Sequence, residues 1–246
     1  MPRAPYPSEP GASAREGAGA RNASAVEPEW NSRYCSVMSG EPIDVRTRDR
    51  DRLPPGQTET AKWPVLHYGN VPRVEAARWT FRVWGEVERP YELSWADFSA
   101  LPRRVVLCDI HCVTHWSRYD NTFSGVPVTE LLERAGVRAH ATHALVHAEQ
   151  DFTTNLPLSD LALEANLLAT HHDGEPLSAE HGGPVRLVVP HLYFWKSAKW
   201  VRGIEVMEGD FPGFWEQNGY HMRGDPWGEE RYGRPDPMRM RRGPRK

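Results

Sequence analysis

The chain has few cysteines and no long apolar segment. Its 246 residues contain three cysteines, Cys35, Cys108 and Cys112, which cannot all pair within the chain, and a secreted domain stabilised by disulfides would carry more. No apolar run approaches the roughly 20 residues that a bilayer-spanning helix needs, so we expect no membrane span. No apolar stretch follows the first charged residues, so we expect no export signal and a cytoplasmic location.

Neither sign of charge dominates the sequence. Thirty Lys and Arg against 33 Asp and Glu give a formal net charge of −3. A dedicated nucleic-acid-binding protein usually carries a strong basic excess, so we expect no nucleic-acid partner. The length suits one sizeable domain with tails, or two small domains.

Composition divides the chain into three parts. Residues 1–56 are rich in Pro, Gly, Ala, Ser and charge, with few regularly spaced apolar positions, which predicts a disordered N-terminal arm. Residues 57–230 have the apolar patterning of a folded domain. Residues 231–246 contain seven basic residues and one Asp, which predicts a basic flexible tail.

Apolar and polar residues alternate over residues 79–87 and 143–148, which is typical of half-buried strands. Further strands are expected at 104–107, 185–189 and 200–207, with a loop over 191–198. Because these strands are short and are interrupted by helical segments and long loops, they indicate an α+β fold.

Three short helices are expected between these strands. Ser94, with Asp97 three residues later, resembles a capping box and predicts a helix over 95–101 that Pro102 ends. Thr129 is expected to cap a helix over 130–135 that Gly136 closes. Ser159 is expected to cap another short helix.

Four potential metal ligands, Cys108, His111, Cys112 and His115, lie within eight residues. Thiolate and imidazole are the ligands that zinc prefers. However, zinc ligands usually come as short pairs from two separated segments, and this run has no Gly or Pro to make a tight turn. A cysteine nucleophile activated by a neighbouring His is a second interpretation. In a third, Cys108 is simply buried in a strand and the histidines are ordinary polar residues.

In a fourth interpretation, Cys112 alone is a soft thiolate ligand to a redox metal whose other ligands come from an organic cofactor. This requires an anion-binding site elsewhere in the chain. Residues 181–186 and 196–200 provide small residues for close backbone approach, and Arg, Lys and Ser as phosphate donors. An ordinary solvated strand end explains these residues equally well, so the alternatives remain open on this ground.

Several separated segments contain further short motifs: PVLHYG (64–69), DIHCVT (109–114) with Trp116-Ser117, GVPV (125–128), HGGPVRLVVP (181–190), KSAKW (196–200) and FWEQNGYH (214–221). In order and spacing they resemble the molybdopterin-binding domain of the sulfite oxidase superfamily. The resemblance covers about residues 60–230. It implies a mixed-sheet fold of the sulfite-oxidase type and a cofactor of molybdenum and molybdopterin.

The resemblance also assigns residues. Cys112 would be the single protein ligand to molybdenum, completing a coordination sphere whose dithiolene sulfurs come from the pterin. The other residues that match cofactor-binding positions are His67, Tyr68, Gly69, His181, Arg186, Ser197, Ala198 and Lys199. Those expected on the substrate side, acting with Cys112, are Arg118, Tyr220 and His221. His111 and His115 flank Cys112 and are expected to tune it.

The segment that follows Cys112 departs from the sulfite oxidases proper. Those enzymes carry a small residue and paired arginines there, which help to bind a dianion, whereas this chain has Val113 to Ser117. The Trp116-Ser117 pair is more similar to single-domain bacterial reductases of the superfamily, which act on S- and N-oxides. The resemblance therefore implies an oxidoreductase that moves an oxygen atom between water and a small-molecule substrate, reducing an S- or N-oxide or oxidising a sulfite-like anion.

No CxxCH haem-attachment motif or glycine-rich dinucleotide motif follows any expected strand. We therefore expect a separate electron donor or acceptor protein. The competing hypothesis is a non-catalytic or zinc-stabilised binding module that uses Cys108, His111, Cys112 and His115.

Overall fold

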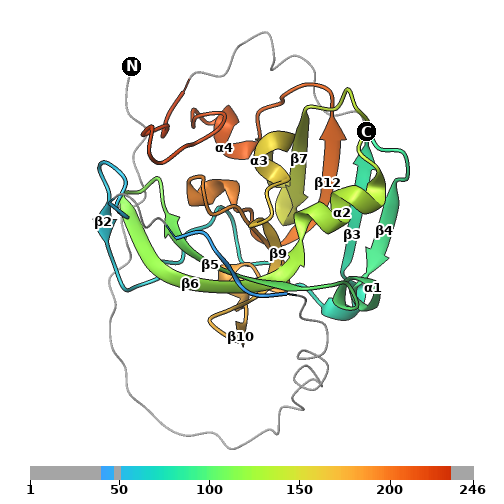
Figure 1. The fold of residues 1–246 in the computed structure, drawn as a ribbon, viewed down its shortest axis with the longest axis horizontal. Coiled ribbons are helices and arrows are strands. Elements are labelled where there is room, and N and C mark those ends of the chain that lie inside the picture. The colour runs from blue at the N-terminus through green and yellow to red at the C-terminus, as the bar shows by residue number, and fades with distance from the viewer. Residues whose placement is uncertain (1–39, 47–50, 234–246) are drawn as a thin grey trace, which may run out of the picture.

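The computed structural model describes residues 40–46 and 51–233, which form two β-sheets joined by short helices and long loops (Figure 1). The larger sheet has the strand order β1-β5-β6-β9-β10, with β2 paired to β6 and β11 paired to β9. Its strands are β1 (Ile43–Asp44), β2 (Thr58–Glu59), β5 (Arg104–His111), β6 (Trp116–Pro127), β9 (Leu167–His172), β10 (Glu175–Pro176) and β11 (Arg186–Val188).

The smaller sheet has the order β4-β3-β12-β7-β8. Its strands are β3 (Thr80–Gly85), β4 (Tyr91–Ser94), β7 (His143–Ala148), β8 (Thr153–Pro157) and β12 (Val201–Met207). Each sheet is mixed, because β1 runs parallel to β5 and β12 runs parallel to β3, while most other pairs are antiparallel. The expected α+β architecture is confirmed.

Four short α-helices and four single turns of 3-10 helix connect the described strands. The α-helices are α1 (Trp95–Ser99), α2 (Val128–Ala135), α3 (Leu158–Leu161) and α4 (Phe214–Gln217), and the 3-10 turns are η2 (Ala76–Arg78), η3 (Glu149–Asp151), η4 (Ala179–His181) and η5 (Phe194–Lys196). None of the described helices is long and apolar enough to cross a membrane.

The main hydrophobic core lies between the two sheets. Phe81, Val83 and Ile204 of the smaller sheet belong to the same fully buried cluster as Val126 and Leu168 of the larger sheet. The alternation expected around residues 79–87 is therefore real, because Phe81 and Val83 face this core while Arg82 between them is exposed. In Figure 1 the curved β6 lies along the lower side of the molecule, crosswise to the strands of the smaller sheet.

Local signals predicted two helix ends correctly and two wrongly. The Ser94 side chain accepts the backbone N–H of Asp97, and the Asp97 side chain accepts that of Ser94, so the capping box is present. Gly136 closes α2 with a φ of 66°. However, α2 begins at Val128 after Pro127, one residue before the Thr129 expected to cap it. Likewise α3 begins at Leu158 after Pro157, without a cap from Ser159.

The expected arm of residues 1–56 lies largely outside the described residues, as do residues 234–246 of the expected tail. Within the described part of the arm, Ile43 pairs with Val106 of β5. Arg52 donates to both carboxylate oxygens of Asp109 at 2.9 and 2.6 Å. Within the described part of the tail, Arg231 is buried. These residues contact the folded domain.

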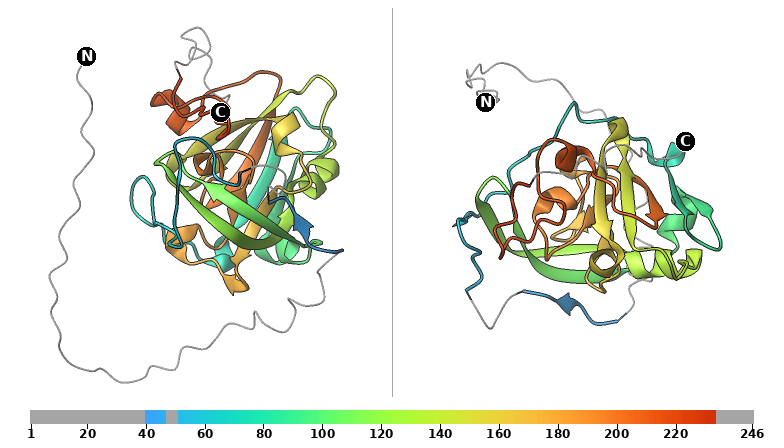
Figure 2. Two further views of the ribbon diagram at one scale, coloured as in Figure 1. Left: turned by 60° about the vertical axis from the view of Figure 1, so that its left-hand side comes forward. Right: turned by 90° about the horizontal axis from the view of Figure 1, so that it is seen from above.

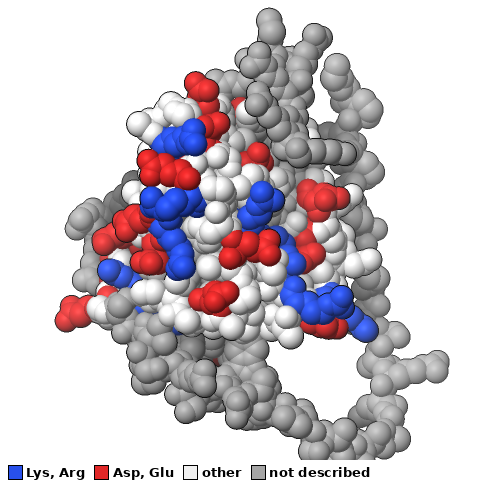
Figure 3. All heavy atoms as spheres, turned by 90° about the vertical axis from the view of Figure 1, so that its right-hand side faces the viewer, with Lys and Arg blue, Asp and Glu red and all other residues white. Residues whose placement is uncertain are grey.

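The segment that follows the expected arm and the described part of the expected tail reach the same end of β6. There β2 pairs with Trp116 and Ser117, at the start of the strand, and Figures 1 and 2 show the red C-terminal segment close to this end. The face of the molecule shown in Figure 3 carries Lys and Arg side chains interspersed with Asp and Glu, so it presents no large surface of a single charge sign.

Candidate active site

Cys112 lies in the tight turn between β5, which ends at His111, and β6, which begins at Trp116. Its backbone N–H donates to Trp116 O at 2.8 Å, and its carbonyl accepts from His115 N at 3.1 Å. His115 has a φ of 71°, in the left-handed region, which allows the chain to reverse without Gly or Pro. Two paired strands therefore hold the position of Cys112.

Aromatic side chains surround the buried Cys112 thiol. It clusters with Val113, Tyr193 and Trp195, and the half-buried Trp116, Trp215 and Tyr220 pack against this group. Its Sγ lies 3.1 Å from Thr114 Oγ1. Burial raises the pKa of the Cys112 thiol, and hydrogen bonding by Thr114 and the positive charge of Arg231 oppose that rise.

The C-terminal segment brings Tyr220 to this cluster but turns His221 towards its own loop. The Tyr220 ring lies 5.2 Å from that of Trp195 and 4.9 Å from that of Trp215, between ring centroids. His221 Nδ1 accepts the backbone N–H groups of Arg223 and Gly224 at 3.2 and 3.1 Å. Of the two, Tyr220 is the residue packed against the Cys112 group.

A buried ion pair fixes the segment that carries Tyr220. Lys196 and Glu216 of α4 lie 2.6 Å apart, and neither side chain has any solvent exposure. Glu216 also accepts Trp195 Nε1 at 2.8 Å. Since Trp195 contacts both Tyr220 and the Cys112 cluster, this pair positions α4 relative to Cys112.

The zinc alternative is wrong for the described residues, because its four candidates do not converge. Cys108 is fully buried in a separate cluster with Val106, Ile110 and Phe123. His111 Nδ1 lies 2.8 Å from Ser117 Oγ, and His115 Nδ1 donates to Gly56 O at 2.7 Å. Among residues 40–46 and 51–233, no group of three His, Cys, Asp or Glu side chains is arranged to hold a metal ion.

A second set of predicted residues forms a basic group around the buried Arg186. Arg186 is 1% exposed and donates to the carbonyls of His181 and Ser197, each at 2.9 Å. No described carboxylate forms an ion pair with it or with Lys199, whose Nζ donates to Glu180 O. Burial lowers the pKa of Arg186 to about 9. Burial and the neighbouring charge of Arg186 lower the pKa of Lys199 to about 7.

Arg186 is held out of water and Lys199 partly so, and neither forms an ion pair with a described carboxylate, an arrangement that is costly unless an anion binds. The donors present are a guanidinium fork, an ammonium and the half-buried His181, and their chemistry fits a phosphate. The residues therefore fit the phosphate-bearing cofactor that the resemblance implies. Ser197 O accepts from Arg186, and Ser197 Oγ accepts Val189 N at 2.9 Å. Ala198 O accepts Leu187 N, the residue after Arg186, at 2.8 Å.

The segment that contains His67, Tyr68 and Gly69 lies between this basic group and α4. The His67 ring lies 5.6 Å from that of Trp200, the residue after Lys199, and the Tyr68 ring lies 4.6 Å from that of Phe214. Tyr68 is 59% exposed. Gly69 has a φ of 71°, in the left-handed region, so the turn favours glycine.

Arg118 belongs to the basic side of the site and not to the group around Cys112. Its Nη2 donates to Asp173 Oδ2 at 3.0 Å, and its Nη1 lies 3.1 Å from His172 Nε2 and donates to Asn121 Oδ1. Asp173 therefore neutralises the charge that was expected to hold the substrate.

Four residues beside these groups were not predicted from the sequence. The Trp63 ring is tilted against those of His181 and His172, with centroids 3.9 and 4.2 Å away, and its centre lies 5.5 Å from the Arg186 guanidinium. Thr114, Gln57 and Arg231 reach Cys112 or its neighbours through hydrogen bonds. Two of them had a signal in the sequence: Trp63 directly precedes the PVLHYG motif, and Thr114 is the last residue of the DIHCVT motif.

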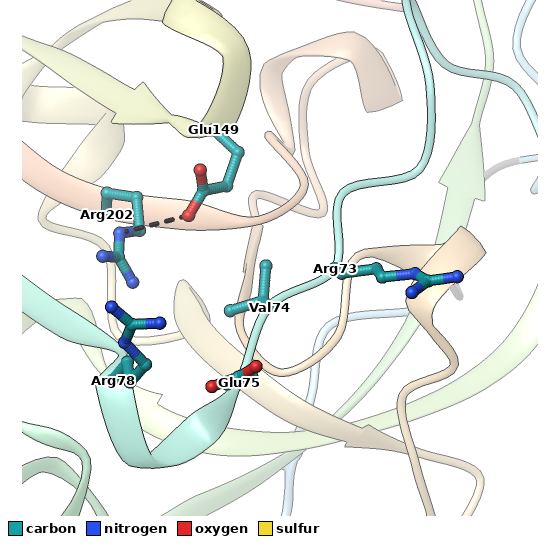
Figure 4. Close-up of a pocket in the computed structure, with 6 residues that line it drawn as sticks. All are labelled: Arg73, Val74, Glu75, Arg78, Glu149 and Arg202. Atoms are coloured by element: carbon teal, nitrogen blue, oxygen red, sulfur yellow. Dashed lines mark ion pairs between the residues drawn. The ribbon is translucent and has the colours of Figure 1, made fainter.

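A separate cavity of about 210 Å³ opens at one end of the smaller sheet. Figure 4 shows the Arg78 and Arg202 guanidinium groups turned towards one another and Arg73 turned away. Arg202 pairs with Glu149 at 3.3 Å. None of the predicted site residues lines this cavity.

Comparison with known proteins identifies the domain. The family described as "Oxidoreductase molybdopterin binding domain" matches residues 68–215, which include Cys112, Arg186 and Lys199. The chain belongs to this family. The resemblance found in the sequence is thereby confirmed, and the domain is a molybdopterin-binding oxidoreductase domain.

Named relatives support the same conclusion. The chain is 52% identical over 191 residues to "Uncharacterized oxidoreductase YuiH" of Bacillus subtilis, covering 76% of this chain and 96% of that protein. It is 28% identical over 159 residues to the "Protein-methionine-sulfoxide reductase catalytic subunit MsrP" of Gluconobacter oxydans, covering 56% of this chain and 50% of that protein. It thus spans nearly all of YuiH but only half of this MsrP.

A solved structure has the same fold. The "Sulfane Dehydrogenase SoxCD" of Paracoccus pantotrophus matches with a TM-score of 0.56 and 21% identity, covering 62% of this chain and 43% of that chain. This likeness confirms the expected mixed-sheet fold with short helices, which the structure shows to consist of two sheets.

Proposed function

We propose that the protein is a molybdenum-cofactor oxidoreductase that removes an oxygen atom from a small neutral S- or N-oxide. The observation that carries this proposal is the buried Arg186 beside the half-buried Lys199, neither of them in an ion pair with a described carboxylate, found in the same domain as the buried, strand-anchored Cys112. The pair fits the phosphate of the cofactor, and Cys112 fits its metal. The family match supports both assignments.

Each residue has a distinct role in this proposal. Arg186, Lys199 and His181 bind the phosphate, and His67, Tyr68 and Gly69 form the side of the site that faces the pterin. Cys112 binds the metal through its sulfur, in a turn fixed by β5 and β6. When bound, the cofactor supplies the two-electron redox change that the protein's own side chains cannot supply.

The surroundings of Cys112 favour a neutral substrate over an oxyanion. Much of its surroundings is the aromatic and aliphatic cluster of Val113, Tyr193, Trp195, Trp116, Trp215 and Tyr220, and burial among these side chains disfavours a free dianion. Arg118 is neutralised by Asp173, so it is a poor partner for sulfite. Tyr220, which packs on this group, is the residue we assign to donate a hydrogen bond or proton to the substrate oxygen.

The reaction written in the reducing direction is R₂S=O + 2 e⁻ + 2 H⁺ → R₂S + H₂O. Its electrons require a separate donor protein, since the expected motifs for a haem or dinucleotide are absent from the sequence. The methionine sulfoxide in the name of the MsrP relative belongs to the same chemical class of substrate.

The test is elemental analysis followed by a substrate screen, on protein purified from a host that makes the pterin cofactor. We expect close to one molybdenum per chain and little zinc, and reduction of dialkyl or aryl sulfoxides by an artificial electron donor. We expect Cys112→Ser to abolish turnover. Turnover retained in Cys112→Ser would refute the assignment of Cys112 as the metal ligand. Oxidation of sulfite without reduction of any S- or N-oxide would refute the proposed class of substrate.

A further inference from the structure

Two residues outside the matched family segment hold the loop that carries Cys112. The family match covers residues 68–215, whereas Gln57 precedes it and Arg231 follows it. Gln57 Nε2 donates to the carbonyl of Cys112 itself at 3.0 Å, and Arg231 Nη1 donates to the carbonyl of Val113 at 2.8 Å. Two adjacent carbonyls of the loop are therefore bound from opposite ends of the described chain.

Arg231 also joins the two flanking segments to one another. Its Nη2 donates to the carbonyls of Pro55 and Gly56 at 3.2 and 3.4 Å. Gly56 O in turn accepts His115 Nδ1 at 2.7 Å. The guanidinium thus lies among the N-terminal segment, the Cys112 loop and the C-terminal segment, and Figures 1 and 2 show these segments meeting at the start of β6.

Gln57 also forms a hydrogen bond with Ser117 of β6, just after the Cys112 loop. Its Oε1 accepts Ser117 Oγ at 3.4 Å, and Ser117 Oγ lies 2.8 Å from His111 Nδ1. Gln57 is 8% exposed and Ser117 is fully buried. The residues on both sides of Cys112, His111 and Val113, are therefore tied through side chains to Gln57 and Arg231.

The charge of Arg231 is poorly compensated within the described residues. It is 6% exposed, its Nε has no hydrogen-bond partner there, and its nearest carboxylate, Glu229, lies 3.9 Å away and is half exposed. Its guanidinium lies 4.9 Å from the centre of the Tyr193 ring, which packs with Cys112. A buried cation of this kind is stabilised by negative charge nearby, and a metal-bound thiolate provides such charge.

We propose that Arg231 and Gln57 are positioning residues for the Cys112 ligand: both fix its loop, and Arg231 also places a positive charge beside the metal-bound sulfur. This inference rests on the proposed function, because it takes Cys112 to be the ligand. The site is then completed by segments that lie outside the family domain.

The test uses full-length protein from a cofactor-producing host and compares Arg231→Met, Arg231→Lys and Gln57→Leu with wild type. Molybdenum per chain, the electron paramagnetic resonance spectrum of the one-electron-reduced metal and its reduction potential are measured for each. Arg223→Met is the matched control, because Arg223 lies in the same C-terminal segment but binds Asp160, at 2.8 and 3.1 Å.

We expect Arg231→Met to lower the reduction potential, since loss of a nearby positive charge disfavours adding an electron. Arg231→Lys should keep the potential near that of wild type and change the spectrum, because it restores the charge but not the forked contacts. Gln57→Leu should change the spectrum with little effect on potential, and Arg223→Met should change neither. If Arg231→Met does not fold, the other two variants carry the test.

Wild-type potentials and spectra in Arg231→Met and Gln57→Leu, at wild-type molybdenum content, would overturn the inference and leave the proposed function intact. Loss of molybdenum from Arg231→Met, with the melting temperature of the apoprotein unchanged, would support the inference that Arg231 positions the Cys112 ligand. Absence of molybdenum from wild type would instead overturn the proposed function, and this inference with it.

Discussion

Lys196 and Glu216 form an ion pair from which solvent is fully excluded, and breaking it tests how α4 is held over the site. Lys196 Nζ lies 2.6 Å from Glu216 and donates to Asn155 O and Oδ1 at 2.9 and 2.8 Å, and to Met222 O at 2.6 Å. Lys196→Met leaves the Glu216 carboxylate buried without its cation. Removal of one partner from such a pair costs about 3–5 kcal/mol.

At about 2–4 °C per kcal/mol for a domain of this size, the melting temperature should fall by roughly 6–20 °C. Urea denaturation gives the free energy of unfolding directly. The double variant Lys196→Met/Glu216→Leu removes both charges, so we expect it to lose less stability than the sum of the two single variants. The matched control is Arg202→Met, which breaks the ion pair with Glu149, in which both side chains are 31% exposed. We expect Arg202→Met to lower the free energy of unfolding by about 1 kcal/mol or less.

A loss below about 1 kcal/mol in Lys196→Met would refute the reasoning. So would single losses that simply add in the double variant, since they would show that the two charges do not depend on each other. Agreement would establish that this pair, and not apolar packing alone, fixes the segment that carries Tyr220.

Three other predictions follow from the described contacts. Burial, together with the charge of Arg103, lowers the pKa of His171 from 6.5 to about 4, so the unfolded chain binds this proton more readily than the folded protein. The free energy of unfolding should therefore fall as the pH decreases from 6.5 to 4, and in urea titrations His171→Gln should flatten this pH dependence. A Cβ at Gly125 would collide with the carbonyl oxygen of Leu168 where β6 pairs with β9, so Gly125→Ala should lower the melting temperature markedly, whereas Gly228→Ala, with room for a Cβ, should not. Inorganic phosphate at ten times its dissociation constant should stabilise the apoprotein by about 1.4 kcal/mol relative to chloride at equal ionic strength, and an equal effect in Arg186→Met would disprove the anion site.

Local patterns in the sequence predicted elements whose causes are local. The capping box of Ser94 and Asp97 and the glycine that closes α2 depend on neighbouring backbone groups. Thr129 failed as a cap because Pro127, whose φ is already fixed near the helical value, leads directly into α2 at Val128.

The longest strand, β6, was not predicted from the sequence because many of its residues are polar and have distant partners. Asn121 is fully buried and donates to the carbonyls of Cys108 and Arg118. Asp120 accepts from Arg46 and Arg52 of the N-terminal segment. No apolar alternation marks such a strand, since its contacts are set by the fold.

In the candidate site, too, local motifs were predictable from the sequence and contacts between distant residues were not. The short motifs around Cys112, Arg186 and Lys199 predicted the domain, which the family match confirms. The burial of Lys196 and Arg231 was not predictable, because Lys196 pairs with a residue 20 positions away and Arg231 binds a carbonyl 118 positions away.

X-ray absorption at the molybdenum edge shows whether Cys112 binds the metal. The measurement counts the sulfur neighbours of molybdenum in the wild-type protein and in Cys112→Ser, with both loaded in the same host. We expect one sulfur neighbour fewer in Cys112→Ser and no change in Cys108→Ala, whose thiol lies in a separate buried cluster. An unchanged sulfur count in Cys112→Ser would contradict it.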